Sequence, residues 1–168
     1  MHLFLTGAVQ CGKSTVVDKV LERVKPSVGG FRTGFGPDRG EPDRLLYLWR
    51  AGEPPVYDES RAVARIAACR PTPLPGRFDA LGTACLAFDR PPQLIIMDEC
   101  GRLERDALAF QRAVLDTLAG EVPVLGVVRE GFPGWTRAVA EHPKVEIIEV
   151  NRLNRDTLPD RIAVRLGF

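Results

Sequence analysis

Short apolar runs alternate with helically spaced apolar positions along most of the chain. Residues 2–6 (HLFLT) form an apolar run that leads into a glycine turn, and apolar residues then recur with helical spacing over 16–24, up to Pro26. This change of period predicts a strand, a loop and a helix. Further buried strands are predicted over 94–97, 122–128 and 145–150, and helices over 79–88, 105–119, 134–141 and from Thr157, with Asp160 completing a capping box. The alternation predicts an α/β fold, a mostly parallel sheet with helices on both faces.

The region between the first helix and residue 79 has a different pattern. Residues 31–35 and 45–49 are predicted to be the arms of a β-hairpin around the turn sequence PDRGEPD. This hairpin would be an antiparallel extension of the sheet. Residues 59–70 are compatible with a helix or an edge strand, and the proline-rich 71–76 is predicted to be a loop.

Composition and charge narrow the classes of function. The 168 residues, 45% of them hydrophobic, suit one globular domain over 1–168. A net charge of +1 gives no global field to attract nucleic acid or anionic lipid, so neither a nucleic acid nor a membrane is indicated as a partner. No apolar run suits a membrane span or a secretory signal. The four cysteines include no C-x-x-C pair, which argues against a structural zinc site. We therefore expect a cytoplasmic protein with reduced thiols.

A phosphate-binding loop follows the first predicted strand, in Gly7-Ala8-Val9-Gln10-Cys11-Gly12-Lys13-Ser14. It matches the Walker A pattern G-x-x-x-x-G-K-[ST], with a strand before it and a helix after it. The glycines allow backbone angles that a Cβ would block, so that consecutive N–H groups can surround phosphate oxygens at the start of a helix. We expect Lys13 to bridge the β- and γ-phosphates and Ser14 to bind Mg²⁺. Thr15 could touch the α-phosphate or be an ordinary first-turn residue.

Two carboxylates, Asp98 and Glu99, end the apolar run 94–97. The carboxyl end of such a strand lies at the edge of the sheet where α/β proteins bind ligands. Asp98 suits the Walker B role of holding Mg²⁺. Alternation along the strand directs Glu99 elsewhere, where it could orient or deprotonate a water beyond the γ-phosphate. A base at this position favours hydrolysis over transfer to another acceptor.

Four segments together resemble the cancer-related nucleoside-triphosphatase family: LTGAVQCGKST (5–15), GGFRTG (29–34), LIIMDECGRLE (94–104) and NRDTL (154–158). The resemblance implies a RecA-like sheet with an added β-hairpin. It also implies Mg²⁺-dependent hydrolysis of several nucleoside triphosphates, such as ATP and GTP, to diphosphate and phosphate. The residues implied to line the nucleotide are 7–14 together with Asp98, Glu99, Cys100, Gly101, Arg102, Leu103 and Glu104.

The chain departs from the family pattern at three places. Gly34 stands where an acidic residue usually follows the threonine, and Cys100 replaces an aliphatic residue. The expected glycine-lysine-aromatic strand before the 79–88 helix is represented only by Gly76-Arg77-Phe78.

Other residues are weaker candidates for the site. Arg129 ends a predicted strand at the same sheet edge and is our first candidate for an arginine finger, with Arg102 second. Asn154 and Arg155 follow the last predicted strand, near where a base or ribose could lie. Cys11 and Cys100 could be oxidation-sensitive or simply packing residues, and Trp49 and Trp135 could stack on a base or pack in the core.

Three functions remain compatible with these motifs. The first is an NTPase, with Glu99 as the base. The second is a nucleotide or small-molecule kinase, which needs an acceptor pocket and an arginine-rich lid, and only 54–77 could supply that lid, through Arg61, Arg65, Arg70 and Arg77. The third is a nucleotide-binding adaptor whose protein partner completes the site. The preferred base and the oligomeric state cannot be read from the sequence.

Overall fold

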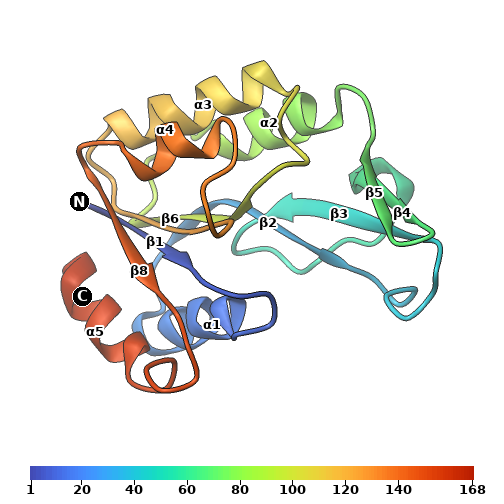
Figure 1. Cartoon of the computed structure of the whole chain (residues 1–168). Helices are drawn as coiled ribbons and strands as arrows, with labels where there is room; N and C mark the ends of the chain where they lie inside the picture. Colours follow the sequence, from blue (N-terminus) through green and yellow to red (C-terminus); the bar gives the residue numbers. More distant parts are fainter.

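All strands belong to one eight-stranded sheet with the order β5-β4-β3-β2-β6-β7-β1-β8 (Figure 1). The structure is a computed structural model that describes residues 1–168. The strands are β1 (His2–Thr6), β2 (Val28–Phe35), β3 (Arg44–Arg50), β4 (Ala62–Ala67), β5 (Arg70–Pro73), β6 (Leu94–Cys100), β7 (Val124–Val128) and β8 (Val145–Glu149). The helices are α1 (Lys13–Val24), α2 (Thr83–Leu86), α3 (Leu108–Ala119), α4 (Thr136–Ala140) and α5 (Leu158–Leu166), with a 3-10 turn at Glu59–Arg61 and a π turn at Phe78–Gly82.

The parallel half of the sheet comprises β2, β6, β7, β1 and β8. Its strands pair in parallel throughout, and β7 lies between β1 and β6. In Figure 1, α1 and α5 cover one face, and α2, α3 and α4 cover the other. This confirms the predicted α/β fold. It also brings the carboxyl ends of β1, β6 and β7 to one edge, where the phosphate loop and Asp98 meet.

The other half of the sheet is an antiparallel extension formed by β3, β4 and β5. The predicted hairpin is confirmed, since β2 and β3 pair antiparallel from Phe31↔Arg50 to Phe35↔Leu46. Residues 62–67 form a strand and not a helix, but this strand is internal rather than an edge, because β4 pairs with both β3 and β5. The predicted loop over 71–76 is wrong for its first residues, because Pro71 and Pro73 belong to β5. Proline is tolerated there because β5 is an edge strand that pairs only with β4.

The core has one large apolar cluster on each face of the sheet, and a third, smaller cluster lies on the extension. Alternation along β1 sends Leu3 and Leu5 to the cluster under α1 and α5, and Phe4 to the cluster that contains Phe110 of α3. Gly126, on the neighbouring β7, leaves room for the Phe4 ring, because a Cβ there would lie 2.2 Å from Phe4 Cε1. This packing fixes the position of β1 and so of the loop that follows it.

One predicted helix start and one predicted capping box are wrong, whereas the last helix begins directly after Thr157, as expected. The helix predicted from residue 105 begins at Leu108, where Asp79 Oδ1 accepts a hydrogen bond of 2.9 Å from the backbone N–H of Phe110. This carboxylate comes from the preceding π turn, so local sequence does not mark the start. The predicted capping box at Thr157 is absent because the Thr157 hydroxyl donates to the carbonyl of Asn154 instead. No helix is long and apolar enough to span a membrane.

Candidate active site

The phosphate loop connects β1 to α1 and surrounds a cavity of about 350 Å³. Gly7 and Gly12 have φ values of 134° and 106°, which favour glycine, and a Cβ on Gly7 would lie 2.5 Å from the carbonyl oxygen of Val150. Lys13 Nζ donates to the carbonyl oxygens of Gly7 at 2.7 Å and Ala8 at 2.8 Å. The ammonium group therefore lies over the loop. The cavity lining is Val9, Gln10, Gly12, Lys13, Ser14, Thr15 and Glu99.

Asp98 and Ser14 meet beside this cavity. Ser14 Oγ lies 3.5 Å from Asp98 Oδ1, and Asp98 is buried with 4% exposure. Burial raises the pKa of Asp98, against the opposing effect of the Arg32 guanidinium. A hydroxyl and a carboxylate oxygen are oxygen ligands of the kind that Mg²⁺ prefers, and Mg²⁺ usually takes its other ligands from phosphates and water. The residues therefore fit a Mg²⁺–nucleotide site.

Arg32 is the site residue that sequence reasoning missed. Its Nε and Nη2 donate to Asp98 Oδ2 at 3.1 and 3.0 Å, and its Nη1 donates to Asp18 Oδ1 at 2.6 Å. Arg32 thus fixes Asp98 through one oxygen and leaves Oδ1 beside Ser14. The neighbouring Thr33 hydroxyl donates to the Asp98 carbonyl at 3.0 Å, so it supports the strand. The GGFRTG segment was the feature of the sequence that could have pointed to Arg32, but the sequence does not reveal that β2 lies beside β6.

Glu99 points in a different direction from Asp98, as alternation predicts. Asp98 is buried and Glu99 is exposed in the mouth of the loop cavity. The β6–β7 register shifts between Met97 and Cys100, and Glu99 has a φ of 80°. Such an irregularity redirects a side chain at the end of a strand. Desolvation in the site and the charge of Asp98 raise the pKa of Glu99, while Lys13 and Arg129 oppose the shift.

The residues after Glu99 form a turn held by buried hydrogen bonds. The backbone N–H of Gly101 donates to Glu104 Oε2 at 2.8 Å, and Trp135 Nε1 donates to the Gly101 carbonyl at 2.9 Å. Glu104 therefore supports the turn, because α3 starts only at Leu108. Cys100 is fully buried in the apolar core, and burial raises the pKa of its thiol, which argues against a reactive thiolate.

Gly101, Arg102, Leu103, Glu104 and Arg129 line a second cavity rather than the loop cavity. The two cavities share Val9 and Glu99, so they are neighbours. Arg129 directly follows β7, and its N–H donates to the Cys100 carbonyl at 3.0 Å. Because β7 lies between β1 and β6, Arg129 comes close to Glu99, and its positive charge partly offsets the rise in the pKa of Glu99.

Arg155 lies against the start of α1, with its Cδ 3.4 Å from where a Gly12 Cβ would be. Asn154 instead uses its amide group within the 151–157 loop, accepting from the Asn151 N–H at 2.9 Å and donating to the Glu149 carbonyl at 2.8 Å. Of this pair, only Arg155 is directed toward the phosphate loop.

A family model described as NTPase matches residues 2–163. The chain belongs to this NTPase family. Members called nucleoside-triphosphatase THEP1 include one from Thermofilum pendens, 36% identical over 96% of this chain and 93% of its own length. Another, from Methanosarcina barkeri, is 27% identical over 98% of this chain and 97% of its own length.

Solved structures of two proteins share the fold. THEP1 from the hyperthermophile Aquifex aeolicus has a TM-score of 0.74 at 20% identity and covers 100% of both chains. A human cancer-related nucleoside triphosphatase has a TM-score of 0.71 at 24% identity and covers 99% of this chain and 97% of its own. The resemblance found in the motifs is confirmed, and the chain is a member of a family of NTP-hydrolysing enzymes.

The departures from the NTPase family pattern have structural reasons. At Gly34, a Cβ would lie 2.9 Å from the Trp49 ring, which packs over this position. Gly76-Arg77-Phe78 forms no strand, because Phe78 is buried and begins the π turn. Trp49 and Trp135 both pack against other aromatic rings, at centroid distances of 6.0 Å to Tyr57 and 6.1 Å to Phe110.

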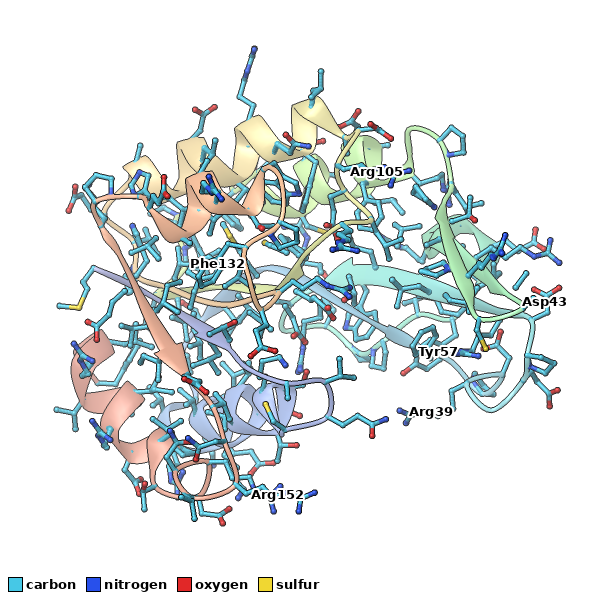
Figure 2. The ribbon with its side chains drawn as sticks, viewed as in Figure 1. Arg39, Asp43, Tyr57, Arg105, Phe132 and Arg152 are labelled. Atoms are coloured by element: carbon cyan, nitrogen blue, oxygen red, sulfur yellow. The ribbon has the colours of Figure 1, made fainter.

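Most of the segment 61–73, the candidate for an arginine-rich kinase lid, belongs to the sheet extension. Residues 62–67 and 70–73 are strands of the sheet. Arg65 pairs with Asp43, which Figure 2 shows at the outer end of the extension. Arg77 donates to the carbonyls of Ala62 and Glu59 at 2.9 and 2.8 Å. These two arginines stabilise the extension and are not directed at the phosphate loop.

Proposed function

We propose that this protein is a Mg²⁺-dependent nucleoside-triphosphatase that releases phosphate from several nucleotides. The observation that supports it most is the position of Glu99. Its carboxylate lines the same cavity as Lys13 and Ser14, beside the buried Asp98. A carboxylate at that place can act on water next to a bound γ-phosphate.

Ser14 and Asp98 Oδ1 would hold Mg²⁺, and Arg32 would keep Asp98 in position through Oδ2. When bound, the ion neutralises charge on the phosphate oxygens. Arg32 also connects this carboxylate to Asp18 on α1, so the two sides of the site form one hydrogen-bonded unit. The loop N–H groups and the positive end of α1 would bind the phosphates.

Lys13 would exchange the carbonyls of Gly7 and Ala8 for β- and γ-phosphate oxygens. Glu99 would orient a water molecule, accept its proton as the water oxygen attacks the γ-phosphorus, and so allow the diphosphate to leave. Desolvation and the charge of Asp98 raise the pKa of Glu99, which makes its carboxylate a stronger proton acceptor than a free one. Arg129 is the first candidate to stabilise negative charge in the transition state, because it lies next to Glu99.

Broad base specificity is part of the proposal. The loop cavity is lined by only one hydrophobic residue, Val9, which is 85% exposed. The flanking Arg155 is an exposed side chain, and the Asn154 amide donates to the Glu149 carbonyl beside its own loop. Phosphate contacts therefore dominate, and these are common to all nucleoside triphosphates.

The test is phosphate release from ATP, GTP, CTP and UTP, without any acceptor, in Mg²⁺ and in EDTA. We expect release from all four, with kcat/KM values within about ten-fold of one another, because weak base contacts contribute little more than about 1.4 kcal/mol. EDTA should abolish release. Tight triphosphate binding without release in Mg²⁺ would contradict the proposal and favour a kinase without its acceptor or an adaptor without its partner.

A further inference from the structure

The second cavity lies between the antiparallel extension and the 99–104 turn and has a volume of about 380 Å³. This volume falls in the range of small-molecule pockets, about 300–1,000 Å³. It contains neither Lys13 nor Ser14 but shares Val9 and Glu99 with the loop cavity. Triphosphate held by the loop would leave this second cavity free, on the far side of Glu99.

One wall of the second cavity is apolar and comes from the extension. Phe35, Leu46 and Ile66, from β2, β3 and β4, line it. None of the three takes part in binding phosphate. The wall can therefore cover the flat apolar body of a ligand, which would give the extension a role beyond the phosphate site.

The cavity also has unpaired positive charge. Arg44, Arg102 and Arg129 line it, and none of them forms a salt bridge. Arg44 lies over the Phe35 ring at 4.9 Å from its centroid, and its Nη1 donates to the Glu41 carbonyl at 2.8 Å. Its Nε is buried and has no hydrogen-bond partner. A buried donor of this kind is costly unless an acceptor completes it.

Two carboxylates, Glu99 and Glu104, also line the cavity. Glu104 Oε2 is occupied by the Gly101 N–H, and burial raises the pKa of Glu104 to about 7, so it is only partly charged at neutral pH. Three guanidinium groups therefore outweigh the negative charge. The charge balance favours an anionic group on the ligand.

We propose that the second cavity binds a small molecule with a flat apolar body and one anionic group, a carboxylate, sulfonate or phosphate, that accepts from Arg44. The apolar body would lie against Phe35, Leu46 and Ile66, and the anion would lie beside Arg44. This placement puts the ligand beside Glu99, next to the reacting phosphate of the proposed NTPase. Binding itself does not require nucleotide or hydrolysis.

The first test is titration of the nucleotide-free protein with the fluorescent probe anilinonaphthalene sulfonate. We expect saturable binding at one site, weakened about ten-fold in Arg44→Gln and retained in Arg44→Lys, because one charge-assisted hydrogen bond is lost only in the first. Arg112→Gln, an exposed arginine of α3 outside the cavity, is the matched control and should bind as the parent does. Phenylnaphthylamine, which lacks the anion, should bind more weakly, and competition by naphthoate and naphthyl phosphate distinguishes a carboxylate from a phosphate ligand.

Two further experiments show where on the protein the probe binds. Lys13→Ala should keep probe binding, since Lys13 lines only the loop cavity. The exposed Cys69 lines the second cavity, so bound probe should slow its alkylation by iodoacetamide but leave that of Cys11 unchanged. Loss of binding in Lys13→Ala, equal binding in Arg44→Gln, or unprotected Cys69 would overturn the proposal. These results are independent of whether the protein releases phosphate.

Discussion

The parallel half of the sheet and its antiparallel extension use their residues differently. Every residue of β1 and β7 is buried, and the carboxyl ends of these strands and of β6 meet at one edge with the phosphate loop, Asp98 and Arg129. In the extension, β5 is almost entirely exposed and β4 alternates toward its end. The residues proposed to carry out the phosphate chemistry therefore lie on the more buried half of the sheet. The extension contributes a wall to a neighbouring cavity.

The sharpest way to test this division is to compare one arginine from each half. Arg129→Gln should reduce the rate of phosphate release about 100-fold, because a guanidinium near the transferred phosphate stabilises transition-state charge. Arg65→Gln should leave the rate unchanged, because Arg65 pairs with Asp43 far out on the extension. Steady-state phosphate release from both variants is the measurement. A slow Arg65 variant with a normal Arg129 variant would place the essential arginine in the extension.

A second comparison concerns two carboxylates that each accept a backbone N–H in a turn. Glu104 is 4% exposed and its pKa is raised by burial to about 7, whereas the pKa of the exposed Asp58 is lowered by its hydrogen bonds with Ser60. For Glu104 the folded state binds the proton more tightly than the unfolded state. Stability should therefore fall as pH rises from about 4.5 to about 7, by up to about 3 kcal/mol.

Glu104→Gln keeps an acceptor for the Gly101 N–H and removes this titration. It should raise the free energy of unfolding at pH 8, relative to the parent, and change it little at pH 4.5. Asp58→Asn should give no such gain. Urea denaturation at both pH values checks this, and a Glu104 variant that is less stable at pH 8 would show that the ionised carboxylate is required.

A third comparison uses one glycine from each half. Gly126→Ala should lower the free energy of unfolding by about 2 kcal/mol, because the new Cβ would lie 2.2 Å from the Phe4 ring in the packed core. Gly40→Ala, in the β2–β3 turn, has open space around it and should change stability by less than about 0.5 kcal/mol. Equal effects in urea denaturation would contradict the packing described for β1 and β7.

The difference between the parallel half and the extension also explains which features could be predicted from the sequence. The loop from Gly7 to Ser14 and the strand that carries Asp98 were predictable because each motif is continuous and its neighbours have a clear period. Alternation predicted that Asp98 and Glu99 point in different directions, although the register shift and the φ of 80° at Glu99 set the final direction of its side chain. The strand β5 was not predictable, because its prolines indicate a loop wherever the position of the strand in the sheet is unknown.

Arg32 and Arg44 show more clearly which site residues could not be predicted from the sequence. Arg32 reaches Asp98 only because β2 pairs with β6, and Arg44 lies at the second cavity only because β3 pairs with β2. The β2–β6 pairing joins segments far apart in the sequence, and although β2 and β3 form a local hairpin, the 99–104 turn that completes the second cavity comes from much later in the chain. With several arginines of similar local context, only the register of the sheet selects these two.

In the proposed mechanism, Glu99 serves the chemical step while the loop binds the nucleotide. The most direct measurement is phosphate release together with triphosphate binding for Glu99→Gln, with Glu22→Gln, an exposed residue of α1, as the matched control. We expect Glu99→Gln to bind triphosphate as the parent does but to release phosphate at least about 100-fold more slowly. Glu22→Gln should match the parent in both binding and phosphate release. Release from Glu99→Gln at the parental rate would contradict the account.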